Sequence, residues 1–186
     1  MKTPALLLTL ALGCAAPLAS AGSLQAPSPY AGEQNRQIKA LAPDRIEGLL
    51  AGRGLGYARA AELNGIPGPM HVLELADALD LTPQQRQATQ SLYDSVQVQA
   101  RALGTELVEA EAALDALFRA EVPDADAIQA QVQAIGAIDA RLRHTHLAAH
   151  LAQKPLLSAE QIHRYTQLRG YHDNGRPQTA HGHTGH

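Results

Sequence analysis

The sequence has little cysteine, few aromatic residues and little net charge. Its single cysteine, Cys14, lies near the amino terminus, and tryptophan is absent. Removal of that segment on export would leave no cysteine, which excludes disulfides, thiol catalysis and cysteine-rich metal sites. The net charge is −3 with neutral histidines, so the strongly basic surface typical of nucleic-acid-binding proteins is missing. Alanine and leucine supply most of the apolar residues, and both favour helices.

The amino terminus has the pattern of a secretory signal peptide over residues 1–21. Lys2 is followed by an apolar run, and small residues at 19–21 offer a cleavage site before Gly22. No apolar run approaches the roughly 20 residues that a membrane-spanning helix needs. We therefore expect a periplasmic protein. An alternative is a lipoprotein anchored at Cys14, because the residues before this cysteine resemble a lipoprotein processing site.

The rest of the chain is predicted to be all-α, with three parts after the signal peptide. These are a flexible leader over 22–42, a helical domain over 43–170 and a disordered, histidine-rich tail over 171–186. Within the domain the expected helices are 44–63 (interrupted or softened by the glycines of 52–56), 71–79, 83–120, 125–153 and a short one after Pro155, with Ile162, Tyr165 and Leu168 facing inward.

The two longest expected helices carry apolar stripes at steps of three and four residues. The first stripe is Leu92, Val96, Leu103, Leu107, Ala110, Leu114 and Leu117, and the second is Ile128, Val132, Ile135, Ile138 and Leu142. Only a short turn at residues 122–124 separates these helices, so they should form an antiparallel hairpin. The predicted fold is a long antiparallel helical hairpin with shorter flanking helices, too slender to bury its own stripes.

Two pentapeptides predict helix starts. Each has a leucine, a hydroxyl residue that can cap the helix, and a glutamine that can reach back to the cap. They consist of Leu81, Thr82 and Gln85, and of Leu157, Ser158 and Gln161. Alone, each is an ordinary capping box.

Two such pentapeptides in one exported helical chain resemble the LTxxQ motif of the Spy/CpxP family, over residues 68–170. The resemblance implies a bent hairpin that forms a homodimer, with the motif residues fixing the two helix starts against each other. It also implies an ATP-independent chaperone or envelope-stress accessory protein, whose partners are misfolded envelope proteins or a membrane sensor. The mildly acidic charge and the Gly/Pro-rich segment 52–69 depart from that family.

The histidines support an alternative function, heavy-metal sensing or sequestration. His146 and His150 are four residues apart, so both lie on one helix face, whereas His144 points elsewhere. That spacing suits Zn, Cu, Ni or Co. Exported heavy-metal sensors, relatives of the same superfamily, resemble similar hairpins with histidine ligands. We expect Asp94 to come near His150 through the pairing of the two long helices.

Ordinary packing also explains these residues. His146 and His150 are then interface histidines that bond to Asp94 or to a backbone carbonyl. His71 with Glu74 is a further weak contributor to a metal site. The tail histidines either bind metal loosely or belong to a solvated tail without defined function; they are His172, His181, His183 and His186.

Catalytic patterns are missing from the sequence. The glycines of 52–56 follow no strand and lack the ending of a phosphate-binding loop. Glu109 and Glu111 are two residues apart, so their side chains diverge around a helix. We therefore expect a binding protein rather than an enzyme, with a purely structural envelope protein as the third alternative.

Overall fold

The computed structural model describes residue 26 and residues 28–171. The expected signal peptide, Cys14 and the tail histidines lie outside the described residues. The chain divides into two compact units, residues 1–32 and residues 33–186. Every helix of the described part belongs to the second unit.

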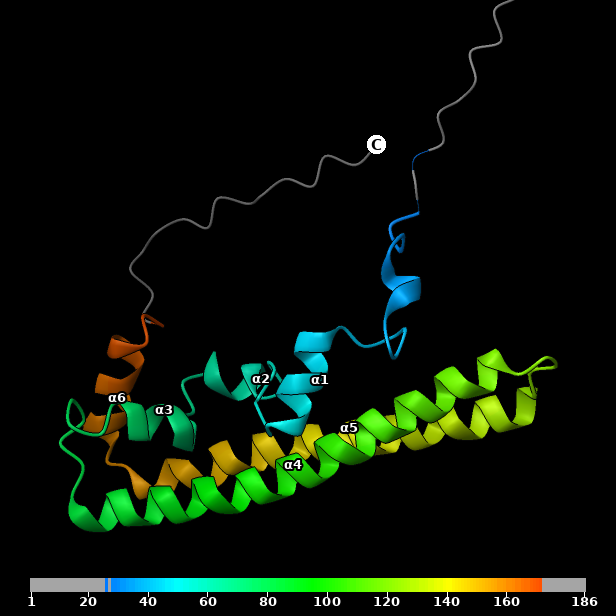
Figure 1. Ribbon diagram of the computed structural model, residues 1–186. Coiled ribbons are helices and arrows are strands. Elements are labelled where there is room, and N and C mark those ends of the chain that lie inside the picture. The colour runs from blue at the N-terminus through cyan, green and yellow to red at the C-terminus, as the bar shows by residue number, and fades with distance from the viewer. Residues whose placement is uncertain (1–25, 27, 172–186) are drawn as a thin grey trace, which may run out of the picture. The chain divides into compact units, whose positions relative to one another are not determined.

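The second unit consists of helices, and the described residues contain no strand. In order they are η1 (Glu33–Asn35), α1 (Pro43–Leu50), α2 (Arg59–Glu62), α3 (Pro69–Glu74), α4 (Pro83–Arg119), α5 (Ala125–Gln153), η2 (Lys154–Leu156) and α6 (Ala159–Leu168). α4 and α5, of 37 and 29 residues, form the antiparallel hairpin, and α1, α2, α3 and α6 lie along one side of it (Figure 1). The predicted all-α hairpin is confirmed. No helix among the described residues is both long and apolar enough to span a membrane.

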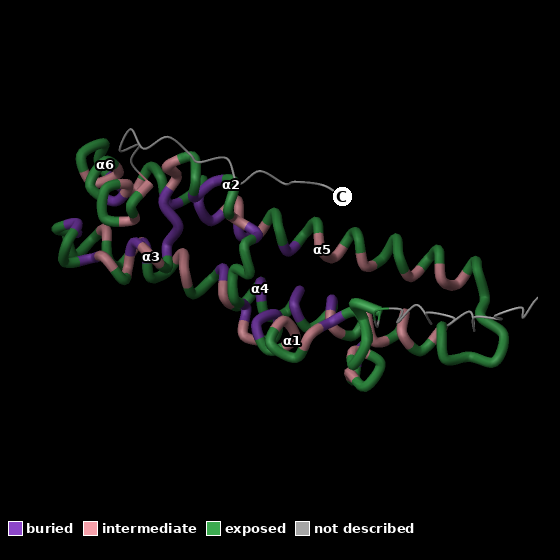
Figure 2. Tube along the Cα trace, turned by 90° about the horizontal axis from the view of Figure 1, so that it is seen from above, coloured by how far each residue is buried: buried purple, intermediate pink, exposed green. Residues whose placement is uncertain are grey.

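The main core lies where α1 and the preceding segment pack on the hairpin. Its buried residues are Ile38, Leu41, Leu49, Tyr57, Ala100, Leu103, Leu107 and Leu142. Ile38 and Leu41 come from the expected flexible leader, so the packed region includes residues before Pro43. Figure 2 shows that burial is concentrated at the covered end of the hairpin, whereas the end with the turn is largely exposed. Val132, expected in the second stripe, is 52% exposed near that turn.

A close helix contact fixes α1 against α4. A Cβ added at Gly104 of α4 would overlap the backbone carbonyl of Leu49 in α1. Glycine at this position therefore lets the two backbones approach each other. The two helices pack as one layer of the core, with Leu49 and Leu103 both buried.

The expected helix 44–63 is broken into α1 and α2. Gly52, Leu55 and Gly56 all have positive φ angles, of 68°, 43° and 81°. This left-handed backbone cannot continue a right-handed helix, so of the predicted interruption or softening the structure shows an interruption. α3 is also shorter than expected: the chain turns after Glu74, although Val72, Ala76 and Leu79 remain buried.

A second buried cluster joins α6 to the start of α4. It consists of Val72, Ala76, Leu79, Leu81, Leu157 and Tyr165. Tyr165 is fully buried, whereas Leu168, expected to face inward, is 48% exposed. α6 has only ten residues, and its inward face is accordingly Ile162 and Tyr165.

Both pentapeptides form complete capping boxes. The Thr82 hydroxyl accepts from the Gln85 N–H at the start of α4, and the Ser158 hydroxyl accepts from the Gln161 N–H at the start of α6. In each box the glutamine side chain also accepts from the cap residue's own N–H. The boxes therefore satisfy backbone donors that would otherwise lack partners at two helix starts.

Candidate functional site

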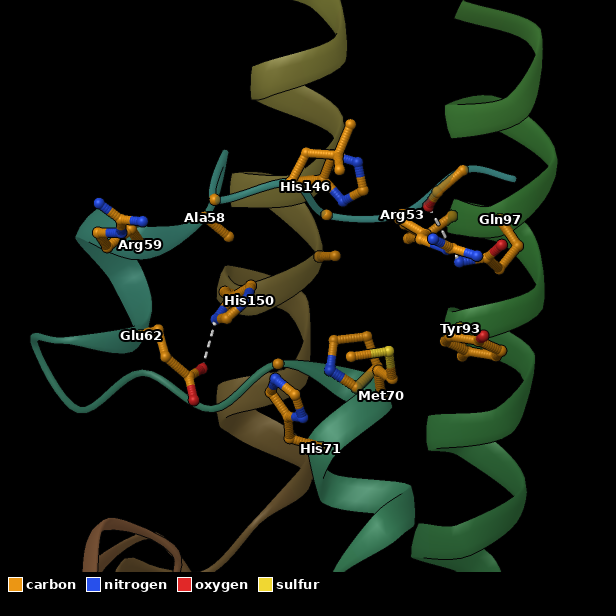
Figure 3. Close-up of a pocket in the computed structure, with 18 of the residues that line it drawn as sticks. Arg53, Ala58, Arg59, Glu62, Met70, His71, Tyr93, Gln97, His146 and His150 are labelled. Atoms are coloured by element: carbon orange, nitrogen blue, oxygen red, sulfur yellow. Dashed lines mark hydrogen bonds and ion pairs between the residues drawn. The ribbon is translucent and has the colours of Figure 1, made fainter. Parts of the chain in front are cut away.

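His146 and His150 lie one turn apart on α5 and line a cleft of about 800 Å³. Both are buried, with 8% and 9% of their surface exposed, whereas His144 is exposed on another face. The cleft is bounded by the loop after α1, by α2, by the start of α3 and by the facing side of α4 (Figure 3). The break between α1 and α2 thus helps to form the cleft wall.

The ring of His150 is held by one nitrogen and leaves the other available. Its Nδ1 lies 2.7 Å from the Ile66 carbonyl oxygen. Because a carbonyl can only accept, Nδ1 carries the proton and the other nitrogen, Nε2, has the lone pair in the neutral ring. A carbonyl partner on one nitrogen is also the usual support for a histidine that binds metal through the other.

Glycine makes room beside that second nitrogen. A Cβ added at Gly68 would lie 2.5 Å from His150 Nε2. Any other residue at this position would therefore collide with the ring. Gly68 is the cap residue of α3, and Met70 and His71 on the first turn of that helix also line the cleft (Figure 3).

His146 is a buried ring with an unpartnered nitrogen. It stacks on Tyr57 with 5.8 Å between ring centroids and an interplanar angle of 6°. Its Nε2 is buried and has no hydrogen-bond partner. Burial lowers the pKa of His146, and the nearby His150 lowers it further. His146 is therefore held as a neutral imidazole, the form that coordinates metals.

Tyr57 is in turn fixed by charged groups. Its hydroxyl donates to Asp139 Oδ1 at 2.5 Å, and Arg45 donates to the same hydroxyl at 3.2 Å. Burial and then the Asp139 carboxylate raise the pKa of Tyr57 to about 12. The tyrosine is thus a neutral, immobilised platform for the ring of His146.

Glu62 is the carboxylate beside His150, and the sequence analysis missed it. Its Oε2 lies 3.8 Å from His150 Nδ1 and is buried without a hydrogen-bond partner. Its Oε1 accepts from the Tyr165 hydroxyl at 2.6 Å and from Arg169 Nε at 3.2 Å. No local pattern marks Glu62, since α2 is a single turn of four residues. The expected neighbour, Asp94, is instead exposed and accepts from Gln90.

The helical domain matches a known protein family. The model of a family described as heavy-metal resistance matches residues 46–164. The chain belongs to the heavy-metal resistance family. No curated protein and no solved structure matches the chain. The match covers both hairpin helices, both pentapeptides and both cleft histidines.

For a member of the heavy-metal resistance family, the relevant test is whether this cleft fits a metal ion. Two features favour the fit: the unpartnered Nε2 of buried His146, and the lone pair of His150 Nε2, since the Ile66 carbonyl holds the proton on Nδ1. The described residues hold no preassembled group of three or more His, Cys, Asp and Glu side chains. The histidines thus fit a two-nitrogen site, and water or the cleft residues Met70 and His71 would have to supply its other ligands.

The family assignment favours the metal function over the chaperone function. The Spy/CpxP resemblance is supported only at the coarser level of the heavy-metal resistance family. His71, the weaker candidate, is also in the cleft wall, but its Nδ1 pairs with Glu74 at 2.8 Å. This leaves His71 Nε2 as its only free nitrogen.

Proposed function

We propose that this protein binds a divalent transition metal through His146 and His150, as an exported heavy-metal sensor or sequestering protein. The observation that carries the proposal is a pair of buried imidazoles one turn apart on α5: His146 Nε2 has no hydrogen-bond partner, and His150 Nε2 has its lone pair because Nδ1 donates to the Ile66 carbonyl. Imidazole nitrogen suits Zn, Cu, Ni and Co. The family match supports the same class of function.

The chain's own residues prepare the two nitrogens for coordination. The Ile66 carbonyl fixes the tautomer of His150, and Tyr57 fixes the ring plane of His146. Burial of His146 keeps its ring neutral. When bound, a metal ion would supply a positive charge that links the hairpin to the shorter helices.

The proposed location of the protein is the periplasm, and the support for it is the amino-terminal sequence. Residues 1–21 have the charge, apolar run and small residues of a signal peptide, which supports action in the periplasm. There the protein would meet incoming metal before it reaches the cytoplasm. Mass spectrometry of the mature amino terminus distinguishes cleavage before Gly22 from lipidation at Cys14.

Calorimetric titration of the full chain with Zn²⁺, Cu²⁺, Ni²⁺ and Co²⁺ tests the proposal. We expect the His146→Ala, His150→Ala double variant to lose at least about tenfold in affinity for the preferred metal, since even indirect ligand contacts contribute about 10–100-fold. His144→Ala is the matched control, because it removes an exposed histidine from the same helix. A second control replaces the four tail histidines. Unchanged affinity in the double variant would reject the site.

A further inference from the structure

We propose that metal occupancy at His146 and His150 is transmitted to α6 through the Glu62 carboxylate, so that the docking of the carboxyl-terminal helix reports the state of the site. The inference rests on the proposed function and adds the element that responds. Its basis is one buried side chain whose two oxygens face different partners.

Glu62 connects the cleft to α6 directly. Oε2 faces His150 Nδ1 at 3.8 Å, and Oε1 accepts from the Tyr165 hydroxyl at 2.6 Å. Arg169, directly after α6, donates to the same Oε1 at 3.2 Å. Any change in the charge facing Oε2 therefore acts on the carboxylate that anchors α6.

Gly68 provides a second link between the same two places. Its missing Cβ leaves space for the His150 ring, and its backbone is among the groups that act on the Tyr165 hydroxyl. Tyr165 of α6 and His150 of the cleft thus share two neighbours, Glu62 and Gly68.

The direction of the effect follows from the electrostatics. Glu62 Oε2 is buried without a hydrogen bond, which is unfavourable for a carboxylate oxygen. When His150 is coordinated through Nε2, its ring is more positive and attracts the nearby Oε2 more strongly, while its Nδ1–H still donates to the Ile66 carbonyl. The carboxylate is then held more firmly in the position that accepts from Tyr165 and Arg169, so α6 docks more tightly.

The Glu62 contacts hold the middle and the end of α6, whereas hydrogen bonds between Gln161 and Gln85 fix its start. A helix of ten residues is marginal without tertiary contacts. Its other charged contact, Arg164 to Asp80 at 2.6 Å, is exposed and contributes little. Only Tyr165 is fully buried among the residues of α6.

Amide hydrogen exchange of the full chain, with and without saturating Zn²⁺, tests the coupling. We expect zinc to slow exchange in α6 (Ala159–Leu168) by about fivefold or more, the lower end of common coupling factors. Glu62→Gln keeps the shape of the side chain but removes its charge, so the zinc effect on α6 should disappear. Tyr165→Phe removes only the hydroxyl link and should reduce the effect.

Asp80→Asn is the matched control. It removes an α6 contact that does not involve His150, and asparagine tolerates the positive φ of 51° at this position. We expect baseline exchange in α6 to be at most slightly faster, because this exposed contact contributes little, and the slowing by zinc to be retained. Loss of the zinc effect in this control would mean that any weakening of α6 abolishes it, which would overturn the specific role of Glu62.

Calorimetry on the same samples separates the two proposals. Zinc binding with unchanged α6 exchange, or with the effect retained in Glu62→Gln, overturns the coupling and leaves the proposed function intact. Binding of none of Zn²⁺, Cu²⁺, Ni²⁺ and Co²⁺ overturns the proposed function, and the coupling with it; where another of the four binds more tightly, it replaces zinc in the exchange experiment. Zinc binding with protection that requires Glu62 supports both.

Discussion

Gln85 and Gln161, 76 residues apart, exchange a reciprocal pair of side-chain hydrogen bonds. Gln85 Nε2 donates to Gln161 Oε1 at 2.8 Å, and Gln161 Nε2 donates to Gln85 Oε1 at 3.0 Å. Each amide also donates to a backbone carbonyl of the other region, at Leu156 and at Leu79. Two capping boxes are thereby joined into one unit that fixes the start of α4 to the start of α6.

Removing one glutamine should destabilise both helix starts. We expect Gln85→Ala to lower the free energy of unfolding by about 1–3 kcal/mol, because it removes a cap contact and leaves Gln161 without its partner. In the Gln85→Ala background, Gln161→Ala should lower the free energy of unfolding by less than it does in the parent protein, because the bonds between the two side chains are already lost. Urea unfolding of the parent, the two single variants and the double variant measures this, with Gln133→Ala at an exposed position on α5 as the control. Strict additivity would contradict the pairing.

The approach of α1 to α4 predicts opposite effects at two helical glycines. Gly104→Ala should destabilise by about 2 kcal/mol or more, because the new Cβ meets the Leu49 backbone carbonyl. Gly136→Ala on α5 has open space around the added Cβ, so it should stabilise by about 0.5–1 kcal/mol through helix propensity. Thermal unfolding distinguishes them. Equal effects at the two positions would contradict the packing described.

Gly68 should be required for metal affinity. Gly68→Ala places a Cβ 2.5 Å from His150 Nε2 and displaces the ring, so we expect a loss of about tenfold or more in affinity, as for other changes that misplace a ligand. Calorimetric metal titration measures the loss. Gly54→Ala, in the same cleft wall but with nothing near the new Cβ, should bind as the parent does. Parent-like metal affinity in the Gly68→Ala variant would show that His150 Nε2 is not the ligand atom.

Acid should weaken the metal-free fold partly through His146. Burial lowers its pKa in the folded state, so the folded protein favours the neutral ring while the unfolded chain keeps a pKa near 6.5. This contribution to stability is present above about pH 6.5 and is lost as pH falls below it. His146→Phe keeps an aromatic ring against Tyr57 but does not titrate. In chelator-treated samples, its unfolding free energy should fall less between about pH 7 and 5 than that of the parent; parallel pH profiles would contradict the prediction.

The hairpin was predictable because its signals are local and repetitive. The pattern predicted 125–153 for the return helix, and α5 spans these residues. The apolar stripes identified most of the core, but Val132 is exposed because no helix covers that end of the hairpin. The glycines of 52–56 predicted an interruption or a softening of the helix, whereas the left-handed backbone of Leu55, which helps to complete the break, has no sequence signature.

The candidate site was predictable only on α5. The spacing of His146 and His150 on one helix face is visible in the sequence, and so is the exposure of His144. Glu62 and Gly68 lie on segments whose positions depend on the fold of a non-repetitive stretch between α1 and α4. Pairing of the long helices pointed to Asp94, but α2 and α3 cover that face of α5 and bring Glu62 to His150. The homodimer, the misfolded-protein client and the membrane sensor partner remain predictions of the resemblance.

The stacking of His146 on Tyr57 gives the protein a built-in optical signal. With no tryptophan in the chain and only five tyrosines, near-ultraviolet absorption and emission come almost wholly from those phenol rings. One of them lies flat against the imidazole at the proposed metal site. Titration of untagged, unlabelled protein can therefore be followed by difference spectroscopy, and a Tyr57→Phe variant assigns the response to this ring.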